Sequence, residues 1–98
     1  MAEIVWAPRA VADLEELIAF ISNDAPIAAR RFAQRIIERV EVLRNHPLSG
    51  SLIDEDDTQT YRQVLQGNYR VIYRVEGETI LVVAVHHGAQ LLDPAGLP

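Results

Sequence analysis

Arginine supplies every strong positive charge in this chain, and this limits the chemistry that the chain can do. All nine basic residues among the 98 are arginines, and no lysine is present. A lysine nucleophile, a Schiff base and the lysine of a phosphate-binding loop are therefore excluded. An arginine fork favours bidentate binding of carboxylate or phosphate, and it anchors many protein interfaces.

Three of these arginines lie where apolar and polar residues alternate, a pattern that predicts β-strands. Arg70 and Arg74 share one face of the strand expected at 69–76. Arg62 joins them if the connection at 66–68 has three residues. If the next turn has two residues, the same face also receives Leu81, Val83, Val85 and His87.

Two interpretations of the three arginines stay open. In the first, they pair with the acidic run at 54–57 or with Glu76 and Glu78. In the second, they form a partly apolar face that is open to a partner. The spacing of the residues does not choose between the two.

A second arginine group stands at 31, 35 and 39, at successive i,i+4 positions of a predicted helix. Like charges at this spacing repel by about 0.2–0.5 kcal/mol per pair, so a compensating charge is expected. One source is the preceding helix, which carries Asp13, Glu15 and Glu16. The alternative is an acidic partner helix.

No cofactor, metal or catalytic group is indicated by the remaining polar residues. His86 and His87 are adjacent, so on a strand they point to opposite faces and cannot chelate one ion together. The acidic run at 54–57 lacks the ligand spacing of a calcium loop and is interpreted as a solvated loop. The sequence therefore favours binding over catalysis.

The periodicities that position these side chains predict an α+β fold of a single domain, 1–98. A strand is expected at 3–6, two helices at 8–21 and 26–45, an exposed loop at 46–60, and strands at 61–65, 69–76 and 79–86. The short loop between the helices predicts an antiparallel hairpin, which packs on an antiparallel sheet with a three-stranded C-terminal meander, in the order β-α-α-β-β-β. Residues 89–98 are expected to form a loosely held tail.

Much of the net charge of −5 comes from one short segment. Residues 54–57 contribute four of the fourteen acidic side chains, whereas residues 30–44 carry five arginines against two glutamates. No segment approaches the roughly 20 apolar residues of a membrane span, so no membrane partner is expected. A cytoplasmic location is the default expectation.

Nearly the whole chain, from Ile4 to Gly88, resembles the ParE/RelE superfamily of bacterial toxins, in particular its ParE branch. The resemblance is carried by the segments IVWAPRAVADLEELIAFI, AARRFAQRIIERVEVLRNHPLSG and YRQVLQGNYRVIYRVEGETILVVAVHHG. Its most specific part runs from Gly67 to Val75 and is followed by a strand that ends in His87-Gly88. The resemblance implies the same β-α-α-β-β-β fold.

The resemblance also implies the toxin of a type II toxin–antitoxin pair. A small antitoxin, ParD-like or similar, is expected to neutralise it, and the pair is expected to contact DNA only through the antitoxin. ParE-like members poison DNA gyrase, whereas RelE-like members cut mRNA in the ribosome with the help of basic residues, lysines among them. This chain has no lysine, and Ala89 and Gln90 stand where a basic pair is expected.

DNA gyrase is therefore the expected target, bound without catalysis. A ribosome-dependent mRNA endoribonuclease and an inactive homologue that only binds antitoxin are the alternatives. The residues expected to contact the target are Arg62, Arg70, Arg74, His86 and His87. The residues expected to contact the antitoxin are Leu17, Phe20, Ile21, Arg31, Arg35 and Arg39.

Overall fold

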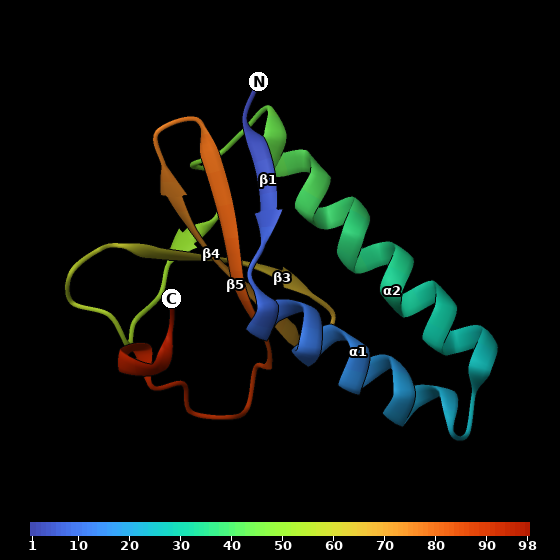
Figure 1. Cartoon of the computed structure of the whole chain (residues 1–98). Coiled ribbons are helices and arrows are strands. Elements are labelled where there is room, and N and C mark those ends of the chain that lie inside the picture. Colours follow the sequence, from blue (N-terminus) through green and yellow to red (C-terminus); the bar gives the residue numbers. More distant parts are fainter.

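The computed structural model describes residues 1–98 as one mixed five-stranded sheet and a helical hairpin. The strands are β1 (Glu3–Trp6), β2 (Ser51–Leu52), β3 (Tyr61–Gln66), β4 (Tyr69–Glu76) and β5 (Thr79–His87). The helices are α1 (Pro8–Ser22) and α2 (Pro26–Glu41), with short 3-10 turns η1 (Val42–Arg44) and η2 (Pro94–Gly96). The predicted α+β fold is confirmed (Figure 1).

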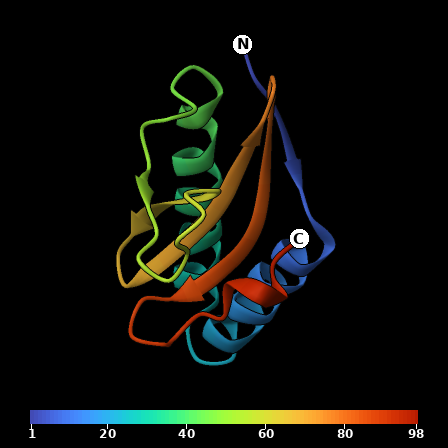
Figure 2. The ribbon, with the colours of Figure 1, turned by 90° about the vertical axis from the view of Figure 1, so that its left-hand side faces the viewer.

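The sheet has the order β1-β5-β4-β3-β2, and both helices lie on one side of it (Figure 2). β3, β4 and β5 form the predicted antiparallel meander, and β1 returns to pair in parallel with β5. The hairpin of α1 and α2 connects β1 to the rest of the sheet and covers its face. Neither helix has the length and the continuous apolar surface that a membrane span requires.

Both helices begin at a proline, where the missing N–H costs nothing. Ala7 precedes α1 and supplies no side-chain cap. α2 ends at Glu41 and continues as the 3-10 turn η1, which ends one residue before the predicted helix end at 45. The sequence therefore predicted the first residue of both helices correctly.

The core between helices and sheet contains the residues that alternation predicts for that side. Val71 and Tyr73 are fully buried against Ile36 and Val40 of α2. The hydroxyl of Tyr73 donates to the carbonyl of Pro47 at 2.7 Å and accepts from the N–H of Gly50 at 3.0 Å. This pair of bonds ties the loop after α2 to the middle of the sheet.

A second apolar cluster lies on the opposite face of the sheet. Ile72 and Val83 are covered there by Ile53, from the loop before β3, and by Leu92 of the C-terminal tail. Residues 46–60 are therefore not a wholly exposed loop, since they contain β2 and the buried Ile53.

The C-terminal tail contacts the folded sheet at Leu92 and at Pro98. Leu92 is only 6% exposed, and the hydroxyl of Tyr61 donates to the carbonyl of Pro98 at 3.1 Å. Composition did not reveal this packing, because the apolar surface that the tail covers is formed only by the folded sheet.

Strand register corrects two predictions about side-chain direction. The turn between β3 and β4 contains two residues, not three, so Arg62 lies opposite Tyr73 and faces the helices. A β-bulge between Ile72 and Tyr73 shifts the pairing with β5 by one residue. A shift of one residue reverses the faces of the strand that follows.

Because of this bulge, the side chains at the end of β5 point to the faces opposite to those predicted. Leu81 and Val83 lie on the face predicted for them, whereas Val85 and His87 pair with Val71 and Tyr69 on the helix side. His86 instead lies opposite Arg70 on the other face.

Candidate functional site

A groove of about 860 Å³ opens where β3, β4 and β5 meet the acidic loop. Its walls include Glu55 of the loop, Arg70 and Tyr69 of β4, and His87 at the end of β5. Gly67, Gly88 and the following backbone complete the wall. The groove thus contains two of the five residues that the sequence assigns to target binding, Arg70 and His87.

Arg70 lies inside this groove with its charge already engaged. Its Nη1 and Nη2 donate to the two carboxylate oxygens of Glu55 at 2.7 and 2.9 Å. Its Nε donates to Oε1 of Gln63 at 2.6 Å, and the residue is only 9% exposed. Of the two interpretations left open by the sequence, pairing with the acidic run is therefore the one realised at Arg70.

The acidic loop is ordered by its own side chains, so it is more than a solvated charge run. Asp56 accepts hydrogen bonds from the hydroxyl of Thr58 at 2.6 Å and from the N–H groups of Thr60 and Tyr61 at 3.0 and 3.1 Å. The pKa of Asp56 is lowered mainly by the hydrogen bonds from Thr58. The pKa of Glu55 is lowered mainly by the hydrogen bond from Arg70. The same hydrogen bonds favour the charged form of both carboxyl groups.

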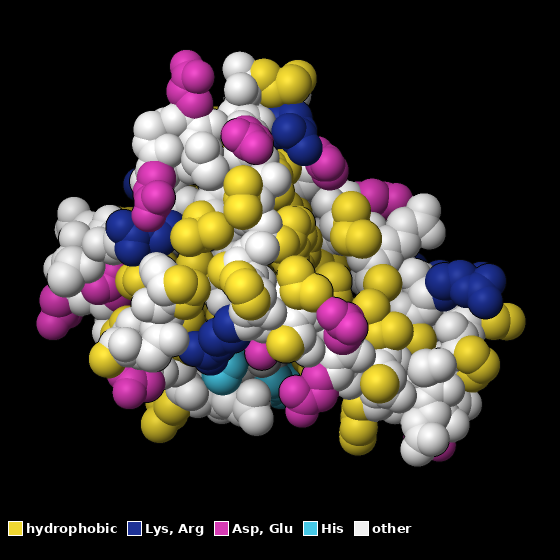
Figure 3. All heavy atoms as spheres, viewed as in Figure 1, with side chains coloured by type: hydrophobic (Ala, Val, Ile, Leu, Met, Phe, Trp, Pro, Cys, Tyr) yellow, Lys and Arg dark blue, Asp and Glu magenta, His cyan; other side chains and the backbone are white.

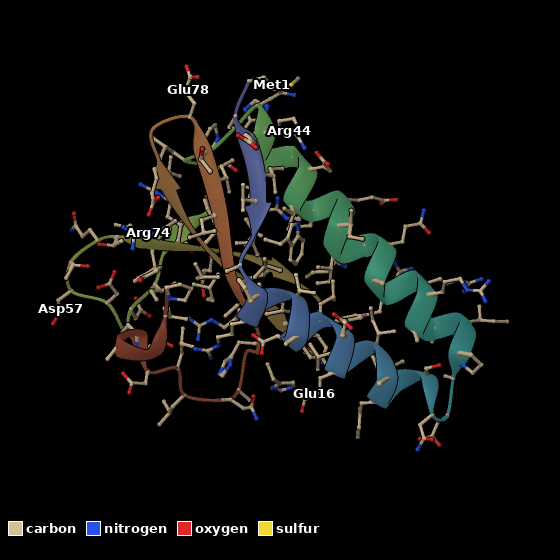
Figure 4. The ribbon with its side chains drawn as sticks, viewed as in Figure 1. Met1, Glu16, Arg44, Asp57, Arg74 and Glu78 are labelled. Atoms are coloured by element: carbon tan, nitrogen blue, oxygen red, sulfur yellow. The ribbon has the colours of Figure 1, made fainter.

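Arg74 and Arg62 do not join Arg70 in the groove. Arg74 lies beside Glu76, with 2.8 Å between Nε and Oε1, and its guanidinium stands 5.6 Å from the ring centroid of Tyr61 (Figure 4). Arg62 donates from Nη1 to the carbonyl of Gly50 at 2.8 Å on the helix side of the sheet. Arg70 and Arg74 therefore share one face of β4, as predicted, but have different partners, whereas Arg62 lies on the opposite face.

The two histidines lie on opposite faces of β5, as their adjacency predicts. Nε2 of His86 is buried without a hydrogen-bond partner. The ring of His87 packs edge-on against Tyr69, with 5.3 Å between centroids, and its Nδ1 accepts from the N–H of Ala89 at 3.1 Å. Figure 3 shows histidine side chains next to acidic ones at this edge of the molecule.

Asp13 holds the end of β5 and is not among the site residues predicted from the sequence. Its Oδ2 accepts from the N–H of Val85 at 3.0 Å. β1 ends at Trp6, opposite Val82, so this part of β5 has no neighbouring strand on that edge. The only sequence signal was the place of Asp13 soon after Pro8 in the segment that carries the family resemblance.

The surface expected to bind an antitoxin extends over the helical hairpin. Phe20 is 76% exposed, and Leu17 lines a second cavity of about 420 Å³ between α1 and β5. Ile21 is half-buried. Exposed apolar side chains along both helices are visible in Figure 3.

The arginine column of α2, formed by Arg31, Arg35 and Arg39, has no partner within the chain. The four ion pairs of the molecule involve other arginines, so the expected compensation by the acidic side chains of α1 is not present. Arg31 and Arg35 are exposed and Arg39 is half-buried. The column therefore keeps its like-charge repulsion in the isolated chain.

Relatives in sequence are toxins. The chain is 34% identical over 92 residues to Toxin RelE2 of Caulobacter vibrioides, covering 93% of this chain and all of that protein. It is 28% identical to Toxin RelE3 of the same organism over 92% of this chain and 98% of that one. A putative toxin of Sinorhizobium fredii, Y4kP, is 29% identical over 85% of each chain.

Solved structures share the fold at lower identity. A chain of the chromosomal ParDE toxin–antitoxin system from P. aeruginosa superposes with a TM-score of 0.76 at 21% identity, covering 89% of this chain and 96% of that one. A chain of the RelBE2 complex from Mycobacterium tuberculosis gives 0.66 at 21% identity, covering 88% and 96%. Residues 4–92 match the family model of the ParE toxin of the type II toxin–antitoxin system parDE. The chain therefore belongs to the ParE toxin family of type II toxin–antitoxin systems.

Proposed function

We propose that this toxin acts by binding a protein target, DNA gyrase, and not by cutting mRNA. The observation that carries the proposal is the ion pair between Arg70 and Glu55 in the groove at the strand ends. It leaves the groove without an arginine that is free to contact a phosphate. The proposal combines this feature with membership of the ParE family.

Cleavage of RNA needs positive groups that stabilise charge as it develops on the phosphate. The groove instead presents negative charge, because Asp54 and Glu55 line it. Its one arginine, Arg70, is neutralised by Glu55. The chain has no lysine that could replace it. A phosphodiester would therefore meet net negative charge, whereas a protein surface is not excluded on this ground.

The antitoxin is proposed to cover the helical hairpin. Phe20 offers a large exposed apolar side chain, and the arginine column of α2 offers three unpaired charges. An amphipathic segment with acidic side chains along one edge complements both features. The solved structures that share the fold support an antitoxin partner, because one belongs to a ParDE toxin–antitoxin system and the other to the RelBE2 toxin–antitoxin complex.

The deciding experiment compares two activities of the purified chain. The proposal predicts inhibition of DNA gyrase in a supercoiling assay, accompanied by trapped cleavage complexes. Ribosome-dependent cleavage of mRNA, measured by primer extension, would contradict it. This second activity deserves a direct assay because the 34% identical relative carries the name RelE2.

Expression without the antitoxin tests the remaining alternative, an inactive homologue. The proposed function predicts growth arrest on induction and its relief when the antitoxin is produced as well. Normal growth at a verified level of folded toxin would contradict it and would favour a chain that only binds antitoxin.

A further inference from the structure

Glu55 and Arg70 form the most enclosed ion pair of the molecule. Their side chains are 23% and 10% exposed, whereas the side chains in the other three ion pairs are 26% to 53% exposed. Charge-assisted bidentate pairs of this kind are stronger than ordinary hydrogen bonds and fix geometry. The pair is thus a fixed structural feature of the groove, unlike an exposed ion pair on the surface.

The backbone on both sides of Glu55 is held in place. Ile53 is 3% exposed and packs on the far face of the sheet, and Asp56 binds the N–H groups of Thr60 and Tyr61. Asp57, in contrast, lies at the outer end of the loop (Figure 4). Glu55 is therefore aimed at Arg70 by anchors that precede and follow it.

Each of the three nitrogens of the Arg70 guanidinium already donates one hydrogen bond within the chain. Nη1 and Nη2 bind Glu55, and Nε binds Gln63. An anion that takes the same bidentate contact with Nη1 and Nη2 would have to displace the Glu55 carboxylate, which lies at 2.7 and 2.9 Å. The groove itself is large enough for such a ligand, since it measures about 860 Å³.

We propose that Glu55 is a specificity-determining residue of this groove. It occupies the arginine fork that a phosphate-bearing ligand would need, and it thereby restricts the groove to ligands without phosphate. This inference rests on the proposed function, because it names the ligand class that the same site rejects. Removing the carboxylate should convert Arg70 into an anion-binding group.

The experiment titrates inorganic phosphate, and separately a single-stranded oligouridylate hexamer, into the full chain. Binding is followed by NMR in the wild type, Glu55→Ala and Glu55→Gln, from the signal of the Arg70 Nε–H group and from the backbone N–H signals of Gly67 and Gly88, which line the groove and remain available in an Arg70 variant. Both variants should bind the two probes at least about tenfold more tightly than the wild type, a factor that corresponds to about 1.4 kcal/mol. Glu55→Gln keeps the shape of the side chain, so it guards against a folding defect in Glu55→Ala.

Two further variants locate the effect. Asp57→Asn removes the same charge from the same loop outside the groove, and it should behave like the wild type. The double variant Glu55→Ala with Arg70→Ala should lose the gained affinity, because the anion would have no fork to bind.

Three outcomes would overturn the proposal. The first is wild-type binding of phosphate at Arg70 as tight as in the variants. The second is a folded Glu55→Gln or Glu55→Ala chain, verified by circular dichroism, that gains no affinity. The third is loss of fold in both variants, which would make the pair structural. The gyrase assay on the wild type decides the proposed function separately, so the two failures are distinguishable.

Discussion

At the scale of the residue, the Tyr73 hydroxyl joins two parts of the molecule through buried hydrogen bonds. It serves both the Pro47 carbonyl and the Gly50 N–H, and burial raises its pKa. Tyr73→Phe should lower the free energy of unfolding by about 1–3 kcal/mol, because both backbone groups lose their partner. Urea unfolding measures the change. Tyr69→Phe is the matched control and should shift stability by less than about 0.5 kcal/mol.

A second residue-scale prediction concerns pH. The pKa of Glu55 is lowered in the folded state from its usual 4.5, mainly by the hydrogen bond from Arg70. A group with a depressed pKa stabilises the fold above its unfolded pKa, and this contribution is lost as pH falls through the folded value. The free energy of unfolding should therefore fall more steeply on acidification below about pH 4.5 in the wild type than in Glu55→Gln.

Asp56 and Glu41 also have lowered pKa values, so Glu55→Gln should reduce the acid dependence without removing it. Denaturant unfolding at a series of pH values provides the comparison. Parallel pH profiles for the two chains would show that the Arg70 pair contributes nothing to stability.

At the scale of the element, α2 carries charge that it does not compensate. Arg35 stands between Arg31 and Arg39, so Arg35→Gln removes two repulsive i,i+4 pairs. The variant should gain about 0.4–1 kcal/mol in unfolding free energy. The same change should weaken binding of the antitoxin, because a charge of the proposed contact surface is lost. Thermal unfolding and calorimetric titration measure the two effects.

Arg30→Gln is the matched control for this element. Arg30 lies on the same helix, but its i+4 neighbour is Gln34 and its i−4 neighbour is Pro26, so no arginine pair is relieved. It should leave stability and antitoxin affinity close to those of the wild type. Equal loss of affinity in both variants would indicate a general effect of charge and would contradict a role of the column.

At the scale of the whole molecule, the sheet is covered on both faces, by the hairpin on one side and by loop and tail on the other. Leu92→Ala should cost about 2–5 kcal/mol, because a leucine that is 6% exposed leaves a cavity in the second core. Guanidinium unfolding tests this expectation. Leu91→Ala serves as control, since Leu91 is 95% exposed, and a similar small effect of both changes would mean that the tail does not pack.

The elements themselves were predictable from the sequence. Prolines 8 and 26 marked both helix starts, and a period of two marked β3, β4 and β5. The bulge after Ile72 was not predictable, because it arises from the pairing of β4 with β5 and leaves no mark in the residue pattern of either strand. For the same reason, the face of Val85 and His87 was predicted wrongly.

The sequence by itself determined the α+β class, the family and the absence of lysine chemistry, because these depend on residue types and local periodicity. Only the tertiary structure decided which carboxylate meets which arginine. Glu55 and Arg70 are 15 residues apart in the chain, and their contact requires the buried Ile53 and the Asp56 turn to fold the loop over β4. The sequence left Arg70 open either to this pairing or to a partner, and long-range packing, which no local pattern records, pairs it with Glu55.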